Sequence, residues 1–134
     1  MAQYYKAGIG AVGNYQVSGV PYITGSGAGG LGAGVEDKVE FPYVAKSVMV
    51  ILNDTQNDDL RIHFNATGSG NVVNGNHYFT LSTNRDSITF NTKCKEIYIS
   101  NPSATSGSGY TVVAELTTIQ TSEMYTLTGS GLTD

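Results

Sequence analysis

Tryptophan is absent from the 134 residues of this chain, cysteine occurs once, and charged residues make up only 13%. A coiled coil or helical bundle needs Glu, Lys and Arg in quantity, so both of these classes are excluded. No run approaches the roughly 18 apolar residues of a membrane-spanning helix. A single cysteine cannot form a disulfide within the chain. The first ten residues lack the apolar stretch of a secretion signal, and we therefore expect folding in a reducing cytoplasm.

Basic residues are also scarce. Lys and Arg number 7 against 11 Asp and Glu, which gives a net charge of -4. A nucleic-acid-binding protein needs clustered cations to displace counterions from phosphates, and here only Lys93 and Lys95 lie close together in sequence. We therefore expect neither a nucleic-acid partner nor attachment to an anionic membrane surface.

The residues that are abundant favour β-structure. The chain has 17 Gly and 9 Tyr, many Thr, Ser and Asn, and 40% hydrophobic residues. This share of apolar residues is enough to bury a core, which argues against intrinsic disorder. Aromatic and β-branched residues fit a pleated sheet, and Gly, Ser and Asn fit the turns between strands. The composition therefore predicts a compact all-β protein with turn-rich connections.

Three zones differ in pattern. Residues 1–34 are rich in Gly and Tyr and nearly uncharged, and we expect an extended arm there, with a strand over residues 15–23 as an option. Residues 35–118 form the densely patterned body. Residues 119–134 form a short tail around a second Gly-Ser-Gly sequence, with one helical turn as an option at residues 122–127.

Within the body, apolar and polar residues alternate over short runs, as in half-buried strands. The pattern predicts seven strands, at residues 35–41, 47–52, 60–65, 78–81, 87–90, 96–100 and 110–117. The run at 47–52 is apolar on both faces, which predicts a central strand covered on two sides. Pro42 is expected to end the first strand or to place it at a sheet edge. Residues 82–86 are expected to close a hairpin between the fourth and fifth strands. Short strands at this spacing are typical of a single β-sandwich, and we predict one of the jelly-roll type.

Motifs that would carry chemistry are weak. Residues 25–32 match Gly-x-Gly-x-x-Gly, but a strand pattern follows where a dinucleotide site needs a helix. Residues 54–59 crowd acidic and amide side chains in one turn, but they lack the spacing of a calcium loop. No Gly-x-Ser-x-Gly sequence is present. We therefore predict a protein that is not an enzyme and that has no metal or cofactor.

The histidines and the cysteine have ordinary interpretations. His63 is expected on the polar side of its strand, and His77 at the start of one, each solvated or hydrogen-bonded. Neither has partners at the spacing of a metal site. Cys94 lies between Lys93 and Lys95, and neighbours on a strand point to opposite faces. We therefore expect a buried thiol between two solvated lysines.

Three segments resemble a known group of proteins. They are Lys93 to Asn101, Gly109 to Thr117 and the terminal Met124 to Asp134, with its Leu-Thr-Gly-Ser-Gly-Leu-Thr run. Over about residues 35–134, the chain resembles small virion structural proteins of marine tailed bacteriophages, including phages of cyanobacteria. The resemblance implies a virion component, and by analogy a protein that decorates or cements the capsid, commonly as a homotrimer bound to the major capsid protein. It carries over no catalytic residues.

Both ends of the chain carry apolar residues flanked by glycines. If the chain attaches to a capsid through its ends, the residues expected to contact the partner are Tyr4, Tyr5, Ile9, Val12, Tyr125, Leu127 and Leu132. Two alternatives remain open. One is a carbohydrate-binding or receptor-binding module of a phage fibre or tail, with loops 67–76 and 103–109 at its site. The other is a head–tail joining or collar protein.

Overall fold

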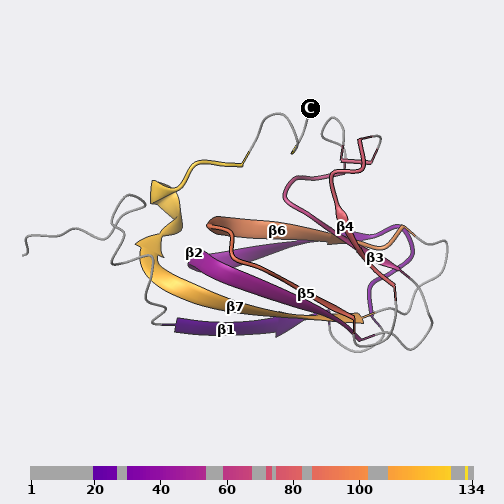
Figure 1. The fold of residues 1–134 in the computed structure, drawn as a ribbon, viewed down its shortest axis with the longest axis horizontal. Coiled ribbons are helices and arrows are strands. Elements are labelled where there is room, and N and C mark those ends of the chain that lie inside the picture. Colours follow the sequence, from indigo (N-terminus) through magenta and orange to yellow (C-terminus); the bar gives the residue numbers. More distant parts are fainter. Residues whose placement is uncertain are drawn as a thin grey trace, which may run out of the picture.

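The computed structural model describes residues 20–26, 30–53, 59–67, 72–73, 75–82, 86–102, 109–127 and 132. They form an all-β, sandwich-like fold, with one short 3-10 turn at the end of the last strand (Figure 1). The elements are β1 (Val20–Gly25), β2 (Glu36–Asn53), β3 (Leu60–His63), β4 (Phe79–Leu81), β5 (Ser87–Phe90), β6 (Cys94–Ser100), β7 (Gly109–Gln120) and η1 (Thr121–Glu123).

Strand pairing confirms the jelly-roll type of sandwich. The antiparallel pairs β1–β7, β2–β6, β2–β5 and β3–β4 are nested in sequence, as in a long hairpin folded over on itself. Two further pairs, β7–β2 and β6–β3, join successive turns of this hairpin. The second half of β2 therefore lies in a layer ordered β1-β7-β2-β5, and its first half in a layer ordered β2-β6-β3-β4. β2 thus supplies two consecutive strands of a jelly roll as one continuous strand.

The strand does not end at Pro42, contrary to the expectation from sequence. β2 continues through Pro42, but its pairing changes there: Glu40 is opposite Glu96 of β6, whereas Tyr43 is opposite Gln120 of β7. The register shifts between Glu40 and Ala45, as at a β-bulge. Since proline has no amide hydrogen to donate, the point where the strand changes partner is the point where proline costs no ladder hydrogen bond.

The expected hairpin between the fourth and fifth strands is also wrong. β4 pairs with β3, and β5 pairs with β2. The Asp86 backbone carbonyl accepts a hydrogen bond from the amide of Leu52, and its carboxylate accepts one from the amide of Ser82. Asp86 therefore fastens the start of β5 to the end of β2, and the two consecutive strands lie in different layers.

One core lies between the layers. The alternation predicted for the strands at 96–100 and 110–117 is confirmed, because every second residue faces this core. In the strand at 47–52, Val48, Val50 and Leu52 face the same core. The inward residues of both layers belong to a single buried cluster, which includes Val48, Val50, Leu52, Leu60, Ile62, Ile97, Ile99, Val112, Ala114 and Leu116. Cys94 is also fully buried in it, as predicted, and burial raises the pKa of its thiol to about 12.

Both predicted end segments contribute to the folded body. Within residues 1–34, the described part contains β1, which overlaps the expected strand at 15–23 and pairs with β7 along its whole length. Leu31 is buried in the core, where the side-chain amide of Asn101 donates to its carbonyl. In the tail, Ile119 and Met124 pack with Val44 in a second, smaller cluster. The helical turn expected at 122–127 is found at 121–123.

Candidate functional site: an aromatic pocket and exposed contact residues

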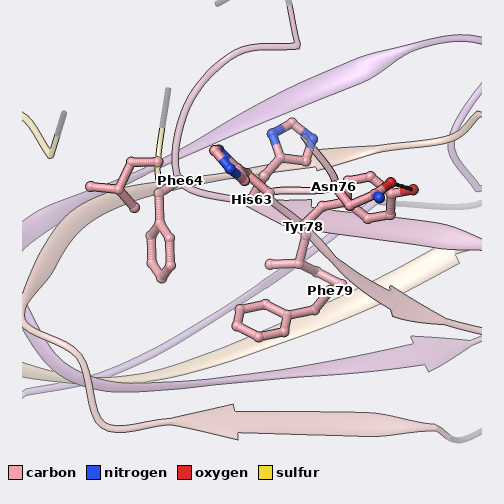
Figure 2. A pocket seen from close by; sticks show the side chains of 8 residues that line it. His63, Phe64, Asn76, Tyr78 and Phe79 are labelled. Atoms are coloured by element: carbon pink, nitrogen blue, oxygen red, sulfur yellow. Dashed lines mark hydrogen bonds between the residues drawn. The ribbon is translucent and has the colours of Figure 1, made fainter. Parts of the chain in front are cut away.

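A pocket of about 250 Å³ lies where β3 and β4 meet the end of the chain. Figure 2 shows several of its side chains: Phe64 lies on one side of His63, Asn76 and Tyr78 lie on the other side, and Phe79 lies below them in this view. Its lining is mostly apolar and comes from three segments, at 62–64, 76–79 and Leu132 of the tail. The lining residues are Ile62, His63, Phe64, Asn76, His77, Tyr78, Phe79 and Leu132.

Aromatic contacts hold the apolar wall in place. Phe90 of β5 stacks on Phe79, with ring centroids 6.1 Å apart and an interplanar angle of 20°. The ring of Phe64 meets Phe90 edge-on, at 5.5 Å and 80°. The guanidinium of Arg61 lies over the ring of Tyr78, 4.4 Å from its centroid. The aromatic wall is therefore braced by other side chains, which reduces the ordering cost of binding.

His63 is buried, which corrects its expected place on the polar side of the strand. Its Nδ1 lies 2.5 Å from the carbonyl oxygen of Asn65, and its Nε2 lies 2.9 Å from Ser100 Oγ. A neutral ring that donates from Nδ1 and accepts the Ser100 hydroxyl proton at Nε2 satisfies both contacts. Burial lowers the pKa of His63, although the Asn65 carbonyl and Glu36 oppose this shift. The outer face of β3 is therefore covered, which a strand pattern alone does not reveal.

Ser100 and His63 are the residue types that serve as a nucleophile and its general base in some enzymes. Both residues are buried, however, and Ser100 does not line the pocket. The ring of His63 is also stacked on Tyr98, 5.9 Å between centroids. A general base needs a free nitrogen within hydrogen-bond reach of a substrate, and although His63 lines the pocket, both of its ring nitrogens already contact groups of the protein. We therefore assign the pair a structural role.

The turn beside the pocket holds two polar side chains of its lining. The backbone of Asn76 has a positive φ of 59°, and its side-chain oxygen accepts a hydrogen bond from the Tyr78 hydroxyl at 3.3 Å. Nδ1 of the next residue, His77, is buried and has no hydrogen-bond partner among the described residues. Buried polar atoms are nearly always paired in folded proteins, so this nitrogen is an exception among the described residues.

A second, more polar hollow of about 370 Å³ lies at the other end of β6, beside η1. Lys38 lines this hollow, and its ammonium nitrogen lies 2.9 Å from a carboxylate oxygen of Glu96 and 3.6 Å from one of Glu40. The hydrogen bond to Glu96 raises the pKa of Lys38. Lys38 is thus paired with both carboxylates of the described lining, whereas Lys95, its other cation, donates to the carbonyl of Met124.

The structure tests where the predicted contact residues lie. Tyr4, Tyr5, Ile9 and Val12 lie outside the described residues. Tyr125 has 68% of its surface exposed. Leu127 is partly buried against both apolar clusters of its own chain, and its carbonyl oxygen accepts a 2.7 Å hydrogen bond from the side chain of buried Asn65. Leu132 lines the pocket. Of the tail residues expected at a partner, Tyr125 therefore presents the most open surface.

Sequence reasoning missed an apolar row on the outer face of the β1-β7-β2-β5 layer. Ile23 of β1 is opposite Val113 of β7, which is opposite Met49 of β2. Ile51 lies two residues further along β2, on the same face. Ile23 is 70% exposed, and the other three are partly exposed. We call these four residues the outer row. The sequence signal was present, since 47–52 is apolar on both faces, but it was interpreted as a strand covered on both sides.

The described residues contain no group of three or more His, Cys, Asp or Glu side chains placed to hold a metal ion. In the same part of the chain, no helix is long and apolar enough to cross a membrane. Comparisons with protein-family models, with curated proteins and with solved structures gave no match.

Proposed function

We propose that this chain is a non-enzymatic structural protein of a bacteriophage virion, which decorates or cements the capsid by non-covalent contacts with the major capsid protein, as a homotrimer. The observation that carries the proposal is the outer row, an apolar strip on an open sheet face that ends at the exposed Ile23. Apolar patches on an otherwise polar surface mark sites of protein contact. The resemblance to phage structural proteins supports the capsid as the partner.

The position of β1 also supports attachment through this face. Among the described residues, β1 pairs only with β7, which makes it an edge strand of the described sheet. Residues 1–19, which contain the predicted contacts Tyr4, Tyr5, Ile9 and Val12, lead directly into this strand. An edge strand beside an apolar face offers a partner both backbone hydrogen bonds and side-chain burial.

Many weak contacts suffice for this function. Each apolar contact contributes roughly 25 cal/mol per Å² of surface removed from water, before the costs of association. Three copies held in one trimer would bind a shell together, and multivalent attachment raises avidity without any new type of contact. The function therefore needs exposed apolar surface on a stable body, and no reaction chemistry.

The first experiment measures where the chain is found. An antibody against the purified chain is used to quantify it across density-gradient fractions of a lysate from its natural source. We expect the chain in the fraction of intact particles, at a copy number comparable to that of the major capsid protein. A chain found only in soluble fractions would overturn the proposal, and a copy number fitting one ring per particle would identify a collar protein instead.

The second experiment tests the outer row. Purified Ile23→Ser protein is mixed with empty capsid shells, and co-sedimentation is compared with that of the unmodified chain. The control is Val73→Ser. Val73 is another exposed β-branched apolar residue, with 43% of its surface exposed, and it lies outside the outer row. We expect Ile23→Ser alone to reduce shell binding. Equal binding by both variants would show that attachment uses another surface.

A further inference from the structure

We propose that the pocket between β3, β4 and Leu132 binds one neutral sugar ring, a hexose or an N-acetylhexosamine. This property goes beyond attachment to a capsid and does not depend on it, because the pocket and the outer row involve different residues.

The size of the pocket limits the ligand. At about 250 Å³ it lies just below the roughly 300–1,000 Å³ of pockets that hold drug-sized molecules. Phe79 in its wall is 41% exposed, so a ligand can reach the ring from solvent. A single six-membered ring fits these limits better than an extended chain or a fused ring system.

The aromatic wall favours a flat ligand with an apolar face. Phe79 and Phe64 are both braced by Phe90, and Tyr78 is covered by Arg61. Aromatic rings bury a large area and select partners by geometry. A pyranose ring carries C–H groups on its faces and hydroxyl groups around its rim, so it can pack on a phenyl ring while its hydroxyls remain free for hydrogen bonds.

The polar groups of the pocket complement those hydroxyls. His77 Nδ1 is buried and has no partner among the described residues, so a ligand hydroxyl entering beside this ring would supply one. The Asn76 side-chain amide lies in the same wall, held by the Tyr78 hydroxyl. A backbone with positive φ at a non-glycine residue is sparsely populated, and such positions recur at functional sites. A purely apolar ligand would leave these groups unpaired.

The charge of the lining excludes a strongly anionic ligand. Among the described residues, the lining has no carboxylate, lysine or arginine, and burial lowers the pKa of His63, which favours its neutral form. The guanidinium of Arg61 already lies over the Tyr78 ring. A phosphate or a sialic acid would therefore find no unengaged cation here, whereas a neutral sugar needs none.

The sequence predicts a carbohydrate site in loops 67–76 and 103–109. Asn76 belongs to the first loop, and residues 103–108 of the second lie outside the described residues.

The test is an NMR titration of the full-length, isotopically labelled chain. The probes are glucose, galactose, mannose and N-acetylglucosamine, with sialic acid as an anionic comparator and glycerol as a polyol without a ring. We expect at least one neutral sugar to shift the signals of His77, Phe79 and Leu132, with half-saturation in the millimolar range that suits one ring in an open pocket. Glycerol should leave these signals in place.

Matched variants complete the test. Phe79→Ala and His77→Ala should each weaken binding by about tenfold or more, as for an anchor residue of a binding site. Val73→Ala, which removes a side chain of similar exposure outside the pocket, should leave binding unchanged. Three results would each overturn the proposal. The first is the absence of NMR shifts with every neutral sugar at about 100 mM, where millimolar binding would be near saturation. The second is unchanged sugar affinity in both pocket variants, and the third is tighter binding of sialic acid than of every neutral sugar.

Discussion

The adjacent residues Met124 and Tyr125 separate the role of the tail in folding from its proposed role in binding. Met124 is 4% exposed and packs with Val44 and Ile119, whereas Tyr125 is 68% exposed. The carbonyl of Met124 also accepts a hydrogen bond from Lys95. We therefore expect Met124→Ala to destabilise the fold and Tyr125→Ala to leave its stability unchanged.

The magnitude follows from burial. Replacing a buried methionine by alanine costs about 2–5 kcal/mol, and the cost is lower where the neighbours can collapse into the space. The cluster around Met124 has only three buried residues, at one end of the sandwich, so we expect about 2–3 kcal/mol. For a domain of this size, that corresponds to a fall in Tm of about 10 °C. Exposed substitutions such as Tyr125→Ala usually change stability by less than about 0.5 kcal/mol.

The assay is equilibrium unfolding in urea, followed by far-UV circular dichroism. All variants are measured at one protein concentration, because association would make the midpoint depend on concentration. Shell co-sedimentation of the same samples should show reduced binding for Tyr125→Ala. An unchanged midpoint for Met124→Ala would refute the packing of the tail onto Val44 and Ile119. Point substitutions are preferable to deletion of residues 122–134, since that deletion also removes Met124.

Three further outcomes follow from the buried groups. The pKa of His63 is lowered in the folded chain relative to its ordinary 6.5, so the unfolded chain binds more protons below that pH. The free energy of unfolding should therefore fall as the pH drops through about 6.5 towards the folded-state pKa. Unfolding curves at several pH values should show a flatter dependence for His63→Gln. Cys94, with its pKa raised to about 12, should react with a thiol reagent only at the rate of unfolding, and rapid labelling of the native chain would contradict its burial. Asn101→Ala should cost about 1–3 kcal/mol in urea unfolding because it removes the side-chain donor to the carbonyls of Leu31 and Gly32, although the Gly32 carbonyl keeps the amide of Val35. Asn91→Ala, at an exposed position, should cost little.

The inward faces of the strands could be predicted from the sequence alone. Val112, Ala114 and Leu116 alternate with their neighbours and point into the core as expected. Residues 47–52 are apolar on both faces, so their sequence did not show that Val48, Val50 and Leu52 would be the inward set. Alternation follows from the backbone geometry of a strand, so it is a local property that each segment carries by itself. The burial of Cys94 could be predicted for the same reason.

The partners of the strands required the tertiary structure. β5 follows β4 in sequence but pairs with β2, and β2 continues through Pro42 because it changes partner there. The choice among antiparallel partners depends on contacts between segments that are distant in sequence, which a local pattern does not record. The burial of His63 has the same origin, since its contact with Ser100 forms only once β3 lies beside β6.

Composition and alternation therefore determined the fold class, the core faces and the lack of an evident catalytic motif. Only the folded chain brought Phe64 of one segment, Phe79 of another and Leu132 of the tail around one pocket, and aligned Ile23 with Val113 and Met49 across three strands. The physical reason is that the period of a strand is set by its own backbone, whereas a pocket or a row across a sheet is set by the pairing of several strands.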